Sequence, residues 1–257
     1  MDVLRHAGDN AVRGGTSRAW LSIPELSALL ESDPTRARRC LDLWLAPGER
    51  DTFARLAVPK RRREWLAGRV AAKELVRGRH RVTAEDALRR IEIVAPREGP
   101  RKGKPSYRID GTPGCFDLSI SHSRDRAVAA LAATPQEHIG IDIEQIEARD
   151  ESFDALALSD PERALLAGLD GEARAIATTE RWVLKEALSK ALGAGLRLRF
   201  EQITVHVGNR GQDGAPSVRF DAPLLRSPVT GEISARLARV GDMCVASVAI
   251  RPVEASP

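Results

Sequence analysis

The stretch IGIDIEQI, residues 139–146, restricts the fold of this chain more than any other segment. Its apolar and polar residues alternate at period two, which is the pattern of a β-strand with one buried face. The alternation places Ile141 and Ile143 on one face and Asp142 and Glu144 on the other. The strand therefore needs an apolar layer on one side and surroundings that tolerate two neighbouring carboxylates on the other.

Helical and strand-like patterns follow one another along the rest of the chain. Helical periodicity covers residues 23–45, 59–78, 161–167 and 179–192. Strand-like runs cover residues 90–96, 115–123, 126–133, 201–207, 217–221, 232–240 and 243–252, and residues 97–107 read as a loop. This mixture of helices and antiparallel-looking strands, with a similar order of elements in each half, predicts an α+β fold.

The length and composition allow two subdomains, each with its own core. The chain has 257 residues, of which 42% are apolar. We expect a flexible leader at residues 1–20, an N-terminal subdomain at 21–136 and a C-terminal subdomain at 137–252.

Cysteine usage and the lack of long apolar runs narrow the class of protein. Cys40, Cys115 and Cys244 are far apart and fit no CxxC or Cys/His spacing, which argues against a disulfide framework and a zinc site. The N-terminus has no apolar signal region, and no run approaches the ~20 apolar residues of a membrane span. These features predict a cytoplasmic protein without a membrane-spanning segment.

The segment RWVLKEALSK, residues 181–190, predicts a helix with two different faces. At about 3.6 residues per turn, one face holds Val183, Leu184, Ala187, Leu188 and Ala191. The other face holds Trp182, Lys185, Glu186, Ser189 and Lys190. Glu186 and Lys190 could form a surface pair that contributes about 0.2–0.5 kcal/mol. Alternatively, Glu186 is a third oxygen ligand of a cation, and Lys185 and Lys190 receive a phosphate.

Three further polar segments have an ordinary interpretation when each is taken alone. SISHS leaves Ser119 and Ser121 on a polar strand face before His122, and a single histidine is usually structural. GKPSY is a turn that offers Lys104, and PKRRREWLAGR is a basic helix. With a formal net charge of +4, the basic helix also fits a nucleic-acid-binding module.

In combination and in this order, RRREWLAGR, GKP, SISHS, GIDIE and WVLKEALSK resemble the motifs of the Sfp-type 4′-phosphopantetheinyl transferases. The resemblance runs from about Pro47 to Ile250. It implies two similar α+β subdomains related by a pseudo-twofold axis, with the active site in the cleft between them. It also implies a Mg²⁺-dependent enzyme that moves the phosphopantetheine arm of coenzyme A to a carrier-protein serine and releases adenosine 3′,5′-bisphosphate.

The resemblance assigns a role to each motif residue. Asp142, Glu144 and Glu186 would hold Mg²⁺, with Mn²⁺ as the alternative, and three carboxylates suit such a hard cation. Glu186 would also accept the serine proton, directly or through water, and Lys190 would stabilise the pyrophosphate and the leaving group. The residues implied to bind coenzyme A are Arg61, Arg62, Arg69, Lys104, Ser121, His122, Lys185 and Lys190.

The resemblance also predicts partners and leaves alternatives. Glu49 and Thr52 stand where some members carry phosphate-binding lysines, so Arg50, Arg55 or the cluster 60–63 would substitute. The expected partner is an apo acyl or peptidyl carrier protein, and one chain would suffice as a monomer. A nucleic-acid-binding module and a non-catalytic coenzyme-binding relative are the alternatives, and the second is disfavoured because every metal-ligand position is acidic.

Overall fold

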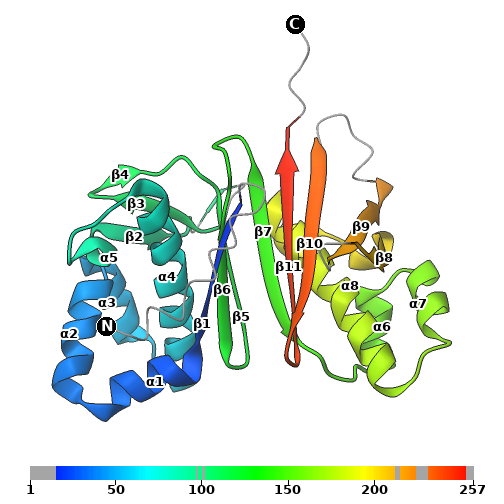
Figure 1. The fold of residues 1–257 in the computed structure, drawn as a ribbon, viewed down its shortest axis with the longest axis horizontal. Coiled ribbons are helices and arrows are strands. Elements are labelled where there is room, and N and C mark those ends of the chain that lie inside the picture. Colours follow the sequence, from blue (N-terminus) through cyan, green and yellow to red (C-terminus); the bar gives the residue numbers. More distant parts are fainter. Residues whose placement is uncertain (1–15, 97, 100–101, 212–214, 224–230, 253–257) are drawn as a thin grey trace, which may run out of the picture. The chain divides into compact units, whose positions relative to one another are not determined.

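The computed structural model describes residues 16–96, 98–99, 102–211, 215–223 and 231–252. The chain divides into two compact units, unit 1 at residues 1–135 and unit 2 at residues 136–257 (Figure 1). Each unit combines helices with antiparallel strands, so the predicted α+β class is confirmed. Among the described residues, no helix is long and apolar enough to cross a membrane.

Unit 1 packs one long helix on a three-stranded sheet. Its helices are α1 Ile23–Ser32, α2 Pro34–Trp44, α3 Pro47–Arg55, α4 Pro59–His80 and α5 Ala87–Arg90. Its strands are β1 Ser17–Ser22, β2 Ile91–Val94, β3 Ser106–Ile109, β4 Thr112–Pro113, β5 Leu118–Ser123 and β6 Arg126–Leu131. Both of its sheets have three strands: the larger sheet, with the longer strands, has the order β1-β6-β5, and the other has the order β2-β3-β4.

Helix α4 forms the centre of the unit 1 core. Pro59 starts the helix where no backbone N–H is needed, and Arg81 ends it in the left-handed conformation. Leu66 and Val70 are fully buried against the sheet. At Gly68 an added Cβ would lie 2.8 Å from Ile120 Cγ2, so the missing side chain brings α4 close to β5.

Unit 2 repeats the strand order of the larger sheet of unit 1. Its helices are α6 Glu151–Ala157, α7 Asp160–Leu166 and α8 Gly171–Leu192, with short 3₁₀ turns η2 Gly195–Arg197 and η3 Phe200–Gln202. Its strands are β7 His138–Gln145, β8 Thr204–Arg210, β9 Pro216–Asp221, β10 Glu232–Val240 and β11 Met243–Arg251. The sheet orders are β7-β11-β10 and β8-β9. In both larger sheets the unit's last strand therefore lies between its first and its penultimate strand.

The contact between α8 and β7 is unusually close. A Cβ on Gly140 would lie 1.9 Å from the Ala187 carbonyl oxygen and 2.5 Å from the Ala191 nitrogen, so the face of β7 that carries Gly140 lies against α8. Because strand side chains alternate, Asp142 and Glu144 share this face. The predicted separation of the two carboxylates from the isoleucines of β7 agrees with this strand geometry.

Outside the leader, each predicted helix and strand corresponds to an element of the structure, but several bounds differ and some elements were not predicted. The leader prediction is wrong for residues 17–20, which belong to β1 and pair with β6, Ala19 opposite Ala129. Residues 1–15 of that leader, and residues 97, 100 and 101 of the predicted loop, lie outside the described residues. The region 23–45 breaks at Asp33, whose side chain caps α2. The loop prediction for 97–107 is wrong at residues 106 and 107, which belong to β3, and the predicted strand 201–207 begins only at Thr204, after η3. Helices α3, α5 and α6 and strands β3 and β4 were not predicted.

Gly140→Ala should lower the thermal unfolding midpoint clearly, because the new methyl group would meet the backbone of α8 and the helix cannot move aside cheaply. Gly168→Ala is the matched control, since a Cβ there meets nothing within 4 Å. Thermal unfolding followed by circular dichroism measures both. Equal midpoints for the two variants would contradict the close contact.

Candidate active site

Three acidic side chains and one lysine gather between β7 and α8. Asp142 and Glu144 project from β7, and Glu186 and Lys190 lie one turn apart on α8. The Lys190 ammonium donates to Asp142 Oδ1 at 2.6 Å. Asp142 is buried, whereas Glu186 and Lys190 are half-buried and keep access to solvent. The structure thus brings these four predicted residues together within unit 2.

The charge of Glu186 is strongly disfavoured in this cluster. Burial raises the pKa of Glu186 to about 7, and the negative charge of Asp142 adds to the rise. The Lys190 ammonium opposes the rise in pKa, and Glu144 contributes a further small increase. A carboxyl group with a pKa near neutrality can both accept and release a proton under ordinary conditions.

The donor set fits a hard cation in its chemistry. The three carboxylates supply only oxygen, and their repulsion is the cost that a bound divalent cation would relieve. As the side chains stand, however, the described residues contain no group of three His, Cys, Asp or Glu side chains arranged to hold a metal ion. Asp142 Oδ1 is engaged by Lys190, and Arg149 lies 3.8 Å from Glu144 Oε2. Each of these carboxylates keeps a second oxygen, so a bound metal would share or exchange these two contacts.

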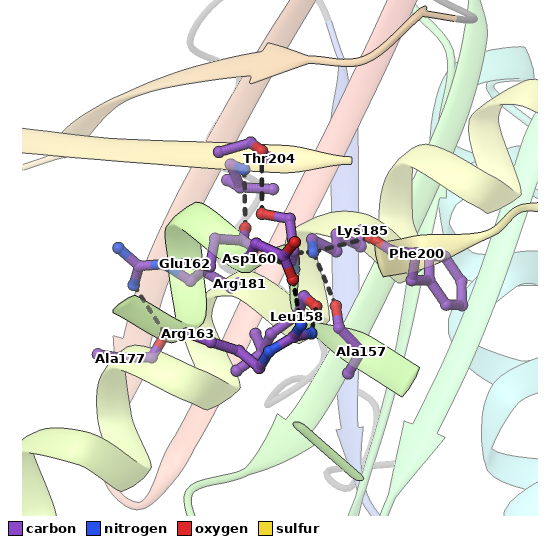
Figure 2. A network of polar contacts seen from close by, with 12 residues as sticks. Ala157, Leu158, Asp160, Glu162, Arg163, Ala177, Arg181, Lys185, Phe200 and Thr204 are labelled. Carbon is purple, nitrogen blue, oxygen red and sulfur yellow. Dashed lines mark hydrogen bonds and ion pairs between the residues drawn. The ribbon is translucent and has the colours of Figure 1, made fainter. Parts of the chain in front are cut away.

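The placement of Lys185 corrects its predicted role as a phosphate ligand. Its side chain is 0% exposed, and its ammonium donates to Glu162 Oε2 at 2.5 Å. The other donors reach the carbonyl oxygens of Ala157 at 2.7 Å and Phe200 at 3.0 Å (Figure 2). Lys185 is buried because its side chain extends to α6, α7 and η3 on a second side of α8, which a two-faced helix pattern does not anticipate. With its three donors engaged, this ammonium has none left for a phosphate.

The predicted residues of GKP and SISHS lie in unit 1. Lys104 is mostly buried and forms an ion pair with Asp117 at 2.5 Å. Ser121 is buried in β5, and His122 follows it with an exposed ring. His122 Nδ1 lies 3.9 Å from Glu64 Oε2 of α4. Each of these groups already has a protein partner, so anion binding would involve exchanging or sharing these contacts.

The predicted arginines follow one another along α4. Arg61 is exposed, and the Arg62 guanidinium lies 4.1 Å from the centre of the Phe53 ring. The Arg69 guanidinium lies 3.7 Å from the centre of the Trp65 ring. Burial lowers the pKa of Arg69 to about 10, partly offset by the charge of Glu49. Stacking on rings fixes both guanidinium groups and leaves their edges as donors.

Several polar residues at the predicted motifs were not identified from the sequence. Glu162 holds Lys185, Asp117 holds Lys104, and Arg149 bridges Glu144 and Glu147. A sequence signal for Glu162 exists. The chain contains PGER at 47–50 and DPER at 160–163, and RVAAKE at 69–74 and RWVLKE at 181–186. This paired repetition marks the same structural element in both units, although no sequence repeat was predicted.

Comparison with known proteins points to one family. The model of the 4′-phosphopantetheinyl transferase superfamily matches residues 138–237. A holo-[acyl-carrier-protein] synthase of Geobacillus kaustophilus is 37% identical over 118 residues, which are 43% of this chain and 81% of that protein. The corresponding protein of Halalkalibacterium halodurans is 31% identical over 121 residues, 46% of this chain and 92% of that protein.

A solved structure of the same kind also resembles part of the chain. It is a holo-(acyl-carrier-protein) synthase from Bacillus anthracis in complex with coenzyme A, with 26% identity and a TM-score of 0.37. The match covers 45% of this chain and 96% of that protein.

Glu186→Gln should raise the thermal midpoint of the metal-free protein at pH 8 and leave it nearly unchanged at pH 4. Because the folded-state pKa of Glu186 lies above its usual value of 4.5, its ionisation costs stability as pH rises from about 4.5 to about 7. The amide removes that cost. Thermal unfolding in a chelating buffer at both pH values measures the difference. The control Glu172→Gln, at an exposed position of the same helix, should give no gain at pH 8.

Proposed function

Because the chain belongs to the 4′-phosphopantetheinyl transferase superfamily, we propose that it transfers the phosphopantetheine arm of coenzyme A to a serine of an apo carrier protein. The named relatives are synthases of holo-acyl-carrier protein. An acyl or a peptidyl carrier protein is the proposed acceptor. The released product is adenosine 3′,5′-bisphosphate.

The observation that carries this proposal is the cluster of Asp142, Glu144, Glu186 and Lys190. Phosphoryl transfer is accelerated by positioning the phosphate and by stabilising the charge that develops on its oxygens. In the metal-free protein the cluster offers a carboxyl group with a pKa of about 7 beside an ammonium group, in a half-buried setting, and a bound cation would lower that pKa. These are the groups that a proton transfer and an anionic leaving group require.

The reaction moves one phosphoryl-linked arm between two oxygens. The serine oxygen forms a bond to the phosphorus that carries the pantetheine arm, and the bond from that phosphorus to the bridging oxygen breaks. The bridging oxygen leaves with the electron pair as part of adenosine 3′,5′-bisphosphate. Glu186 accepts the serine proton, directly or through water, and Lys190 stabilises the charge on the departing phosphate.

A divalent cation is part of the proposal. Asp142, Glu144 and Glu186 would hold Mg²⁺, or Mn²⁺ in its place, because their mutual repulsion favours a cation among them. When bound, such a cation neutralises charge on the pyrophosphate and orients it. Lys190, which engages Asp142 in the metal-free protein, would then be available to the phosphate.

We also propose that coenzyme A is bound by residues of unit 1. The coenzyme contacts are Arg61, Arg62, Arg69, Lys104, Ser121 and His122, all in unit 1. Lys185 is not among the proposed coenzyme contacts, since all three donors of its ammonium are engaged. We place the enzyme in the cytoplasm as a monomer, in keeping with the sequence expectations.

Incubation with coenzyme A, Mg²⁺ and a panel of apo acyl and peptidyl carrier proteins should add the mass of the arm to a carrier serine, as read by intact-protein mass spectrometry. Glu186→Gln should slow transfer by about 100-fold or more, because an amide cannot accept the proton and is a poorer metal ligand. Glu172→Gln is the matched control and should retain activity.

Two outcomes would argue against the transferase. The first is a folded protein that modifies none of the carriers, and the second is full activity of Glu186→Gln. Salt-dependent binding to nucleic acid, unaffected by coenzyme A, would instead support the alternative of a basic nucleic-acid-binding module.

A further inference from the structure

Lys185 directly precedes Glu186, yet its side chain serves a different purpose. Its ammonium is fully buried and bonded to an oxygen from each of α6, α7 and η3. Burial lowers the pKa of Lys185, and the Glu162 carboxylate offsets part of this effect. Glu162 in turn accepts from the backbone N–H groups of Ser159 and Val205. We call this set of contacts the Lys185 anchor.

Unit 1 contains the same arrangement around Lys73. The Lys73 ammonium donates to Glu49 Oε2 and to the carbonyl oxygens of Trp44 at 2.7 Å and Leu88 at 3.0 Å. Glu49 accepts from the backbone N–H groups of Ala46 and Ile93, as Glu162 does from its own two. The Lys73 anchor therefore matches the Lys185 anchor contact for contact.

The two anchors differ in the surroundings of the next residue along the helix. Glu74, the residue after Lys73, pairs with Arg77 on its own helix at 2.8 Å. Strand β1, which holds the place of β7 in the sheet order, contains no acidic residue. In unit 2 the residue after the anchor is Glu186, beside Asp142 and Glu144. Of the two anchors, the Lys185 anchor is therefore the one that adjoins a carboxylate cluster.

Two contacts determine where Glu186 stands relative to β7. On one side, the absence of a Cβ at Gly140 lets the backbone of α8 lie against the strand at Ala187. On another side, the Lys185 anchor ties the same turn of α8 to α7, η3 and β8. Glu186 lies between Lys185 and Ala187 in the chain, so both contacts act on the turn that carries its carboxylate.

We propose that Lys185 is a positioning residue that holds Glu186 in register with Asp142 and Glu144 for cation binding. The inference rests on the proposed function, and it replaces the role of Lys185 as a phosphate ligand. Loss of an outer-shell contact to a metal ligand typically changes metal affinity by about 10- to 100-fold. Lys185 contacts none of the three carboxylates and acts through the backbone of α8, so we expect the lower end of that range. If Lys185 only stabilised the fold, its loss would leave the cation affinity of the folded protein as unchanged as the loss of Lys73 does.

The test compares Lys185→Met with Lys73→Met. Each substitution leaves one buried carboxylate without its ammonium, so both should lower the thermal midpoint by a similar amount. Mn²⁺ binding to each folded, substrate-free variant is measured by isothermal titration calorimetry. We expect Lys185→Met to bind Mn²⁺ about 10-fold more weakly or worse. Lys73→Met should stay within about twofold of the unaltered protein.

A second measurement separates positioning from phosphate binding. Coenzyme A affinity is determined in a chelating buffer, where no cation contributes. A positioning role predicts little change for Lys185→Met. Loss of coenzyme A affinity with unchanged Mn²⁺ affinity would restore the phosphate-ligand role and overturn the proposal, as would equal Mn²⁺ affinities of the two lysine variants.

Milder variants cover the case in which the methionine variants do not fold. Glu162→Gln and Glu49→Gln keep the side-chain size in each anchor, and only Glu162→Gln should weaken Mn²⁺ binding. Equal Mn²⁺ affinities of these two variants would overturn the proposal.

Measurements on the unaltered protein distinguish a failure of the proposed function from a failure of the positioning role of Lys185. If it transfers the arm and binds Mn²⁺ but the paired variants do not differ, only the role of Lys185 fails. If it neither transfers the arm nor binds Mn²⁺, both the proposed function and the positioning role fail.

Discussion

Each unit depends on one buried lysine whose hydrogen-bonding capacity is fully used. Removing an ammonium and a carboxylate from water costs several kcal/mol per ion, so such a pair persists only when its remaining donors and acceptors are also satisfied. Lys73 and Lys185 meet this condition, because each donates to one carboxylate oxygen and two carbonyl oxygens. The partner carboxylates accept backbone N–H groups at the start of one helix and in a strand. One side chain thereby fixes the mutual arrangement of several short segments that have little core of their own.

The electrostatics of the candidate site differ from those of the buried lysine pairs, because like charges lie together there. Around Lys185 the buried ammonium is matched by one carboxylate. Around Glu186, by contrast, three acidic groups lie together, with Lys190 at Asp142 and Arg149 at Glu144, and the charge of Glu186 remains costly. The first arrangement stabilises the fold, and the second leaves a carboxyl group whose charge is costly. Such an imbalance is common where a protein binds a cation or moves a proton. The two arrangements lie on neighbouring residues of one helix, Lys185 and Glu186.

The sequence predicted most of the fold and the composition of the cluster, because both depend on local periodicity. Strand alternation placed Asp142 and Glu144 on one face, and helical spacing placed Glu186 beside Lys190. Lys185 was assigned wrongly because periodicity describes a helix with one buried side, and α8 is covered on a second side by segments distant in sequence. Strand β1 was missed because SRAWLS lacks clear alternation and is defined by its pairing with β6. The acidic partners Glu162 and Asp117 were missed because only the tertiary structure brings them to their lysines.

The close approach at Gly140 also has a mechanical consequence. A loosely packed helix could move away from the strand, and the greater distance would reduce the repulsion among Asp142, Glu144 and Glu186. Here the backbone of α8 rests against β7 with no side chain between them, and the packed layers leave little room for sliding. The electrostatic repulsion among the three carboxyl groups therefore persists in the folded protein. It is relieved when a side chain rotates, a carboxyl group takes up a proton or a cation binds. A residue without a side chain gives the cluster its stiffness.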